Sequence, residues 1–425
     1  MSWLFPLVLL LLALCGTPLF VIIAASAMWG FTQDGTDLQV MAINIYQLAE
    51  MPVLIAIPLF TFAGYLLGES KAPSRLVRMT DVFLGWMPGG LAIVAITACA
   101  LFTAFTGASG VTIVALGALL VPALAKAGYN EKFNLGLVTS SGSLGLLFAP
   151  SLPLILYGVV VQQMSIGTPV SIDDLFLAGI LPGVLMLVAL SIYSALQKPV
   201  NPAPKKQFNA KEAWLAIKDS AWEIPLPFLV LGGIYGGFFA ISEAAALTAI
   251  YVLTVTVIIR REISFRKLPI VMRDSMKLVG AILLILAVSI ASTNYMIDAG
   301  IPQQIFDVIQ AHISSPITFL LLLTVFLLVL GMMLDIFSAI VIMIPILLPI
   351  AMQYGIHPIH LGILFLANMQ LGYFTPPVGM NLFIASFRFK KPVTELYIAT
   401  IPFFFILLAC VLIITFWPWL SLVFI

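Results

Sequence analysis

Long apolar stretches, separated by short polar connections, run through almost the whole chain. A helix needs about 20 apolar residues to cross the ~30 Å hydrocarbon core of a membrane. Crossings of this length are predicted at residues 3–29, 51–69, 131–160, 175–197, 222–239, 241–259, 277–297, 357–387 and 394–423. Two further apolar stretches, 89–127 and 316–354, have a polar turn in the middle. The pattern predicts an all-α polytopic membrane protein.

The first stretch is predicted to be a retained membrane helix. Residues 1–20 lack the basic segment with which a signal peptide begins, and the apolar run continues through Pro18 to Trp29. Leu14, which precedes Cys15, is too large for a typical lipoprotein cleavage site.

The positions of lysine and arginine predict the orientation in the membrane. All 19 fall in five groups, at residues 71–78, 126–132, 198–218, 260–277 and 388–391. The connections 30–50, 161–174, 298–315 and 354–360 contain none. Cytoplasmic connections are enriched in Lys and Arg, so the five groups are assigned to the cytoplasm. With the crossings above, the N-terminus is then cytoplasmic and the C-terminus lies outside.

The two stretches with a central turn are predicted to be re-entrant hairpins. Residues 89–127 start and end on the cytoplasmic side, and residues 316–354 start and end outside. Two full crossings each would satisfy the same charge pattern. However, the turns at 107–110 and 331–338 are polar, and no charge-rich loop follows them. Non-helical backbone is tolerated at membrane depth only inside protein or beside a water-filled cavity.

An offset of 227 residues aligns the two halves of the chain without a gap. It pairs prolines and glycines, which interrupt or end regular backbone structure: Pro122 with Pro349, Gly128 with Gly355, Gly145 with Gly372, and Pro150 with Pro377. Their shared spacing predicts a shared backbone path. Because the charge pattern gives the halves opposite orientations, we predict two inverted repeats, an architecture typical of secondary transporters.

The repeat predicts the domain organisation. The first inverted repeat spans 1–197, with scaffold helices in 1–88, a hairpin and broken helix in 89–160, and a helix at 175–197. A cytoplasmic linker and an extra helix occupy 198–240. The second inverted repeat spans 241–425, with its hairpin and broken helix at 316–387.

Each hairpin is followed by a helix that polar and helix-breaking residues interrupt, at 140–151 and at 368–381. Proline leaves a backbone carbonyl without its helical partner, and such carbonyls suit Na⁺ together with Ser, Thr and Asn oxygens. The N-termini of half-helices suit a carboxylate. The candidate substrate-binding residues within these interruptions are Ser141, Ser143, Asn368, Pro376 and Asn381.

Asp335 is the one acid predicted to lie deep in the membrane. Intramembrane carboxylates are costly and usually functional, which favours a role in cation binding. Capping the second arm of the hairpin is the alternative interpretation. Glu243, at the start of another predicted helix, is expected to cap that helix.

The composition excludes a water-soluble fold. Hydrophobic residues make up 62% of the 425 and charged residues 9%, whereas about a quarter of the residues in a soluble domain are charged. The net charge of +1 gives no indication of nucleic-acid binding. The three cysteines lie in apolar runs without metal or redox spacing. His312, His357 and His360 are expected in solvated outer connections, with no ligand set among them.

Several short motifs follow one another in a specific order. They are Gly107-Ala108-Ser109-Gly110, the run Leu116 to Gly128, Ser151-Leu152-Pro153 before Tyr157-Gly158, Ser242-Glu243-Ala244-Ala245, Pro345-Ile346-Leu347-Leu348-Pro349, and Thr375-Pro376-Pro377-Val378-Gly379-Met380-Asn381. The last is the most specific. In order and spacing the chain resembles, along essentially its whole length, the large, DctM-like membrane subunit of tripartite ATP-independent periplasmic (TRAP) transporters.

The resemblance implies an elevator-type secondary transporter in the bacterial cytoplasmic (inner) membrane, and not an enzyme. Its hairpins and broken helices would form a mobile transport domain, and Na⁺ would be the coupling ion. It implies a small four-helix membrane subunit, which is expected to be a separate chain, and a periplasmic substrate-binding protein. Substrates of the family are small organic acids, including C4-dicarboxylates and sialic acid, and the resemblance favours sialic acid.

The resemblance also implies where the cation sites lie, namely where each hairpin tip meets its broken helix. In this chain the corresponding residues are Ser109 and Gly145 in the first half, and Gly331, Asp335, Gly372 and Thr375 in the second. Phe148-Ala149 stands where many relatives have a second proline pair, so the first site is expected to differ in detail.

Three other functions stay open at this point. A stand-alone Na⁺-coupled anion transporter of the same architecture would need no periplasmic protein. A channel would show flux without saturation and without coupled cation movement. An intramembrane serine protease would use Ser109 in its Gly-x-Ser-Gly-like context, but that chemistry requires a general base close to the serine, and the histidines are predicted on the opposite side of the membrane.

Overall fold

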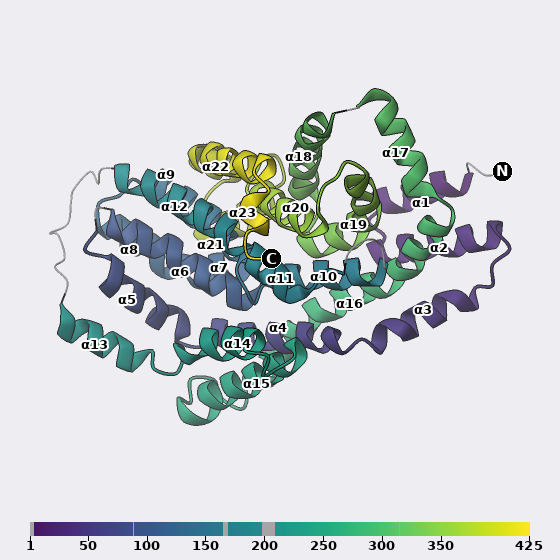
Figure 1. Cartoon of the computed structure of the whole chain (residues 1–425). Helices are drawn as coiled ribbons and strands as arrows, with labels where there is room; N and C mark the ends of the chain where they lie inside the picture. The colour runs from purple at the N-terminus through teal and green to yellow at the C-terminus, as the bar shows by residue number, and fades with distance from the viewer. Residues whose placement is uncertain (1–3, 88, 165–168, 198–208, 314) are drawn as a thin grey trace.

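The computed structural model describes residues 4–87, 89–164, 169–197, 209–313 and 315–425. Every regular element within these ranges is helical (Figure 1). Seven of the described helices are long and apolar enough to cross a membrane, or up to nine when each of two bent helix pairs counts as one crossing. The prediction of an all-α polytopic membrane protein is confirmed. Residues 198–208 of the predicted linker lie outside the described ranges.

The N-terminal apolar stretch forms two helices, α1 (Leu4–Leu14) and α2 (Leu19–Gln33). The prediction of one continuous crossing at 3–29 is therefore wrong. Gly16 adopts a left-handed backbone conformation, with φ of +83°, and Pro18 has no N–H to donate to a preceding turn. Together these two residues end one helix before the next begins.

Each predicted hairpin consists of two apolar arms joined by a short turn. In the first half the arms are α6 (Gly90–Thr106) and the pair α7 (Ser109–Ala115) and α8 (Gly117–Lys126), which is bent by 50°. In the second half they are α18 (Pro316–Met333) and α19 (Ile336–Gln353). Only two residues separate the arms in each case, so both pairs are tight hairpins.

The predicted interruptions of the two following helices are confirmed. The first consists of α9 (Glu131–Ser141), a short 3-10 turn η2 (Leu144–Leu147) and α10 (Leu152–Met164), with a bend of 41°. The second consists of α20 (Pro358–Gly372) and α21 (Met380–Phe389). The helix ends at each gap leave backbone groups that have no partner within their own helix.

The offset of 227 residues also holds in the backbone. It maps residues 109–126, which form α7 and α8, onto 336–353, which form α19. Gly128 and Gly355, matched by the same offset, adopt left-handed φ angles of +86° and +77° just after these arms end. Glycine reaches this region without a steric penalty, so the matched glycines end the two arms in the same way.

The remaining helices form a framework around the hairpins and broken helices (Figure 1). In chain order they are α3 (Gln39–Ala49), η1 (Pro52–Ile55), α4 (Ala56–Glu69), α5 (Ala72–Leu84), α11 (Ile172–Ala178), α12 (Ile180–Leu196), α13 (Ala210–Asp219), α14 (Pro225–Tyr235), α15 (Ile241–Leu253), the π-helix η3 (Thr254–Ile259), α16 (Leu268–Asp298), α17 (Ile301–His312), α22 (Val393–Phe416) and α23 (Trp419–Leu422).

One framework helix is shorter than predicted. The crossing expected at 222–239 contains α14, which has only 11 residues, so it rises roughly 16 Å rather than the ~30 Å of a membrane core. Gly237 follows the helix with a left-handed φ of +69°. The glycines after Tyr235 thus end the helix early.

The start of α15 is capped as the sequence predicts. The carboxylate of Glu243 accepts a hydrogen bond from the backbone N–H of Ala240, with 2.9 Å between the nitrogen and Oε2. This bond satisfies one of the N–H groups that every helix start leaves without a partner.

His360 corrects the prediction that all three histidines lie in solvated connections. Because α20 begins at Pro358, His360 lies in its first turn and is buried. Its Nδ1 lies 3.2 Å from the hydroxyl of Ser421 in α23. A polar group at this depth requires a hydrogen-bond partner, and the C-terminal helix provides one.

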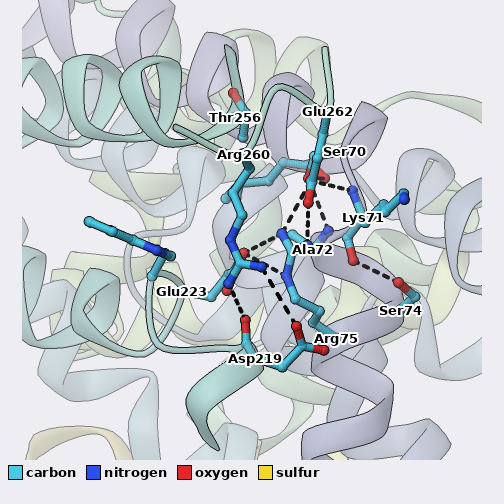
Figure 2. A network of polar contacts seen from close by, with 12 residues as sticks. Ser70, Lys71, Ala72, Ser74, Arg75, Asp219, Glu223, Thr256, Arg260 and Glu262 are labelled. Atoms are coloured by element: carbon cyan, nitrogen blue, oxygen red, sulfur yellow. Dashed lines mark hydrogen bonds and ion pairs between the residues drawn. The ribbon is translucent and has the colours of Figure 1, made fainter. Parts of the chain in front are cut away.

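A buried ion-pair network joins α5 to two other parts of the framework, the segment before α14 and the segment after η3 (Figure 2). Arg75, which is 6% exposed, donates hydrogen bonds to the carboxylates of Glu223 and Glu262. Burial alone would raise the pKa of Glu262, but the hydrogen bonds from Arg75 and from the backbone of Lys71 lower that pKa below its ordinary value. A lowered carboxylate pKa means that the ion pair stabilises the fold at neutral pH and is lost only as the pH falls through that value.

Gly372→Ala tests a close approach between the backbones of two helices. A Cβ atom at Gly372 would lie 2.6 Å from the Cα of Gly331 in α18, so we expect α18 and α20 to be pushed apart at a cost of about 1–3 kcal/mol. Thermal unfolding of the purified protein in detergent measures this as a lower melting temperature.

Gly280→Ala is the matched control, because nothing lies within 4 Å of a Cβ added there in α16. We expect this variant to melt at or slightly above the wild-type temperature, since alanine favours a helix over glycine by about 1 kcal/mol. Equal melting temperatures for the two variants would contradict the close approach.

Candidate functional site

The two hairpins and the two broken helices pack in a crossed arrangement at the centre of the molecule. The first arm of each hairpin packs on the broken helix of its own half, α6 on η2 and α18 on α20. The second arm of each hairpin also packs on the broken helix of the other half: α7 packs on α21, and α19 packs on α10 (Figure 1). Each hairpin therefore contacts the broken helices of both halves, and the site is built from both halves of the chain.

Glycines allow the contacts within each half. A Cβ at Gly145 would lie 2.2 Å from the backbone oxygen of Ala100 in α6. The matched Gly372 has the same relation to Gly331 in α18. These three glycines, all candidate cation-site residues, bring backbone close to backbone at the two hairpins, and a side chain at Gly145 or Gly372 would force the helices apart.

The tip of the first hairpin contacts the broken helix of the other half. Ser109 is buried and its hydroxyl donates to Oδ1 of Asn381, at 2.8 Å. Asn381 in turn donates from Nδ2 to the backbone oxygen of Thr139, at 3.4 Å. The structure thus joins a predicted cation residue and a predicted substrate residue directly, in a contact that sequence spacing did not indicate.

Two threonines that sequence reasoning missed complete what we call the first-tip cluster, made of Thr103, Ser109, Thr112, the carbonyl of Gly142, and Asn381. The hydroxyls of Thr103 and Thr112 lie 2.6 Å apart, and Thr103 donates to the carbonyl oxygen of Gly142 at 2.8 Å. Both threonines are buried. The sequence could have indicated these two threonines, because they are polar residues on the two arms of an otherwise apolar hairpin. Clustered hydroxyl and carbonyl oxygens are ligands that hard cations prefer.

The two broken helices meet at residues matched by the 227 offset. The hydroxyl of Ser143 donates to the backbone oxygen of Gln370, its matched residue, at 3.2 Å. A contact between equivalent residues is typical of a two-fold relation. The centre of the site therefore lies where the first broken helix crosses the second.

Amide oxygens at this crossing have no partner. Asn368 donates from Nδ2 to the backbone oxygen of Leu364, at 2.8 Å, but its Oδ1 and the Oε1 of Gln370 have no hydrogen-bond partner among the residues that the structure describes. Both side chains are fully buried. Buried polar atoms without partners are exceptional, and Gln370 is a further candidate that sequence reasoning missed. Ser141, matched with Asn368, bonds back to Leu137 instead.

Asp335 forms the centre of a second-tip cluster, made of Asp335, Ser338 and Tyr373. Its carboxylate caps α19, accepting from the backbone N–H groups of Phe337 and Ser338 at 3.0 Å each. The Tyr373 oxygen accepts from the preceding N–H, that of Ile336, at 2.6 Å. The capping interpretation is confirmed, and a cation role for the same carboxylate stays a prediction. The Thr375 hydroxyl bonds back to Leu371, at 2.7 Å.

Pro376 does not join the buried site residues. It is exposed, in the gap between α20 and α21, whereas Ser141, Ser143, Asn368 and Asn381 are buried. The candidate substrate residues therefore divide into a buried set at the helix crossing and an exposed proline at the rim of the gap.

A cleft of 580 Å³ opens beside the first-tip cluster. It lies between α4, α7 and α21, and its walls include Tyr65, Gly110, Ile384 and Phe387. Phe387 is 90% exposed. Gly110, in the wall of this cleft, directly follows Ser109. The cleft therefore ends one residue away from the hydrogen bond between Ser109 and Asn381.

The family described as “Tripartite ATP-independent periplasmic transporter, DctM component” matches residues 4–420. The chain belongs to this family. It is 32% identical to the “C4-dicarboxylate TRAP transporter large permease protein DctM” of Rhodobacter capsulatus, over 97% of this chain and 96% of that protein. It is 31% identical to the “Ectoine/5-hydroxyectoine TRAP transporter large permease protein UehC” of Ruegeria pomeroyi, over 98% and 96%.

A solved structure supports the fold of this DctM-family chain. The Alcanivorax borkumensis YdaH transporter matches with a TM-score of 0.63 and 15% identity, over 89% of this chain and 87% of that one. The DctM-family chain is a transport permease and not an enzyme, which removes the protease interpretation of Ser109.

A double-mutant cycle tests the contact between the halves. Ser109→Ala and Asn381→Ala each remove one partner of a buried hydrogen bond, so we expect a coupling energy of about 0.5–1.5 kcal/mol in the free energy of unfolding. Reversible unfolding in mixed micelles provides the measurement.

Ser191→Ala provides the control for this cycle. Within the described part of the chain, the Ser191 hydroxyl bonds only inside α12, to the backbone oxygen of Leu187. Its effect should therefore add to that of Asn381→Ala without coupling. Additive effects of Ser109→Ala and Asn381→Ala would mean that the hydrogen bond between the halves contributes nothing.

Proposed function

We propose that the chain is the transport subunit of a Na⁺-coupled, binding-protein-dependent importer of a small organic acid. The observation that carries the proposal is the crossed packing of two hairpin tips on two broken helices, with buried oxygens at both tips. In the first-tip cluster all ligating groups are neutral, so a bound monovalent cation would supply the only charge there. In the second-tip cluster the carboxylate of Asp335 could neutralise a second cation.

The substrate proposal rests on the crossing of the broken helices. Asn368, Gln370 and Asn381 place amides there, and α21 begins within the same gap. The N-terminus of a helix favours a carboxylate. C4-dicarboxylates, named for the R. capsulatus relative, fit this chemistry, and sialic acid stays a candidate on the resemblance alone.

The mechanism that we propose is movement of the hairpins and broken helices as one body. They pack on one another across both halves, and a cleft of 580 Å³ opens between α7, α21 and α4 of the framework. The inverted repeats 1–197 and 241–425 would then supply two halves of one transport domain. The Lys- and Arg-rich connections would lie in the cytoplasm, with the N-terminus on that side and the C-terminus in the periplasm.

The proposed assembly has three components, in which a small four-helix membrane subunit and a periplasmic substrate-binding protein join this chain. Support comes from the family, described as tripartite, and from relatives named as large permeases. The alternative is a stand-alone Na⁺-coupled anion transporter.

Uptake into proteoliposomes distinguishes these possibilities. This chain would be reconstituted with its small subunit and supplied with labelled C4-dicarboxylate or sialic acid, with and without an inward Na⁺ gradient and the binding protein. We expect uptake only when both are present, because binding-protein delivery and cation entry are both part of the cycle. Uptake without the binding protein would favour the stand-alone transporter, and flux without saturation would favour a channel.

Asp335→Asn separates a charge role from a capping role. Asparagine caps a helix about as well as aspartate, so the variant keeps α19 but removes the negative charge. We expect the Na⁺ concentration for half-maximal uptake to rise about tenfold or more, as for loss of a charged ligand, while the melting temperature changes little.

Asp307→Asn is the control, because Asp307 lies in α17 and, among the residues that the structure describes, bonds only to the exposed Gln303. It should leave the Na⁺ dependence unchanged. If Asp335→Asn behaves like Asp307→Asn, while Asp335→Ala lowers the melting temperature, then Asp335 acts only as a cap.

A further inference from the structure

A second cavity lies away from the transport site, where α5 faces α6. Its volume is 420 Å³, within the ~300–1,000 Å³ of ligand pockets. Its walls come from α4, from α5, from α6 of the first hairpin, and from α13, α14 and the segment that joins them. They are almost entirely apolar and include Leu76, Met79, Leu101, Phe105 and Pro227. The cavity therefore touches both the framework and a hairpin arm.

Two polar side chains line this cavity and leave an atom without a partner. The hydroxyl of Ser220 and the Oε2 of Glu223 have no hydrogen-bond partner among the residues that the structure describes. Ser220 is only 2% exposed. A buried carboxylate oxygen can only accept hydrogen bonds, and leaving it unpaired is costly. The carboxylate oxygen therefore requires a ligand that donates, and the Ser220 hydroxyl can accept from the same ligand or donate to it.

The neighbouring charges do not supply that donor. Arg75 is engaged by the other oxygen of Glu223 and by Glu262, and Arg260 is engaged by Asp219 and its carbonyl (Figure 2). The guanidinium groups are thus already paired, and Glu223 keeps one oxygen in excess. A cationic donor complements this oxygen, whereas an anionic group would be repelled by it.

Exposed tryptophans place the polar end of the cavity at the level of lipid headgroups. Trp214 and Trp222, which bracket Ser220 in the chain, are 67% and 38% exposed. Tryptophan is enriched at the boundary between membrane and water. Lys218, between them, is also exposed. The apolar walls on α6 belong to a hairpin arm of the membrane protein, so the cavity runs from the headgroup level toward the hydrocarbon.

We propose that this cavity binds one phospholipid with an ammonium headgroup, as in phosphatidylethanolamine. One acyl chain fills the space between Leu76, Leu101 and Phe105. The ammonium donates to Glu223 Oε2 and to the hydroxyl of Ser220. The lipid then bridges the framework helix α5 and the hairpin arm α6. The proposal does not depend on the identity of the transported substrate or of the coupling ion.

Native mass spectrometry of the purified chain, with equal amounts of phosphatidylethanolamine and phosphatidylglycerol in the micelle, tests the proposal. We expect one phosphatidylethanolamine to stay bound at energies that remove the other lipids. The preference over phosphatidylglycerol should be about tenfold, as for one hydrogen bond to a charged group. Glu223→Gln should abolish the preference. Equal retention of the two lipids by the wild type would overturn the headgroup assignment.

Ala72→Phe tests the position, because Ala72 lines the cavity and is buried. This variant should lose the retained lipid. Ser74→Phe adds the same bulk to the exposed side of α5 and should keep it. If Ala72→Phe does not fold, Leu101→Trp fills the cavity from α6 instead. Retention of the lipid by a folded cavity-filling variant would overturn the proposal.

Cross-linking provides a measurement that does not depend on retention. Phosphatidylethanolamine with a photoreactive group on one acyl chain should label peptides that contain Leu76, Leu101 or Phe105. Labelling spread over the lipid-facing helices, with none enriched at this cavity, would show a general lipid annulus and overturn the site.

Discussion

The structure depends on one constraint, which is that a membrane core offers no water to backbone groups that leave a helix. Both broken helices interrupt their hydrogen-bond ladders in the middle of the protein. Each gap must therefore be covered by other protein segments. The hairpins provide this cover, and they do so crosswise, with α7 on α21 and α19 on α10. A site shared by both halves follows, because hairpin arms of both halves pack on each broken helix.

The same constraint explains which side chains occupy the centre. Gly145 and Gly372 let a hairpin arm approach the backbone of a broken helix, where any side chain would collide with it. Ser, Thr and Asn then fill the remaining space with short polar groups, which bond to carbonyls and to one another. These neutral oxygens hold the protein together when nothing is bound. The same side chains are groups to which a cation or a carboxylate can bind, so packing and binding use the same atoms.

Charge is concentrated at the edge of the fold rather than at its centre. Arg75, Glu223 and Glu262 join α5 to two segments that are distant in sequence (Figure 2). Ion pairs in such a position hold an amphipathic helix in place where hydrophobic contacts with one face alone would let it shift. The cavity beside them has apolar walls on α6, so the edge of the framework and the first hairpin share one boundary. A lipid at that boundary would belong to the structure rather than to the surrounding membrane.

The sequence by itself determined the membrane class, the two hairpins, the interrupted helices and the offset of 227 residues, because apolar length, proline and glycine act locally on the backbone. It also indicated Asn381 and Asp335, since polar residues are conspicuous in apolar surroundings, and the family resemblance implied Ser109. It could not show that Ser109 bonds to Asn381, that Thr103 and Thr112 meet, or that Gln370 lies at the crossing. Those contacts join residues on separate helices, and only the packing of one helix on another decides them. For the same reason His360, predicted in a solvated loop, is buried against a C-terminal helix whose position no local pattern reveals.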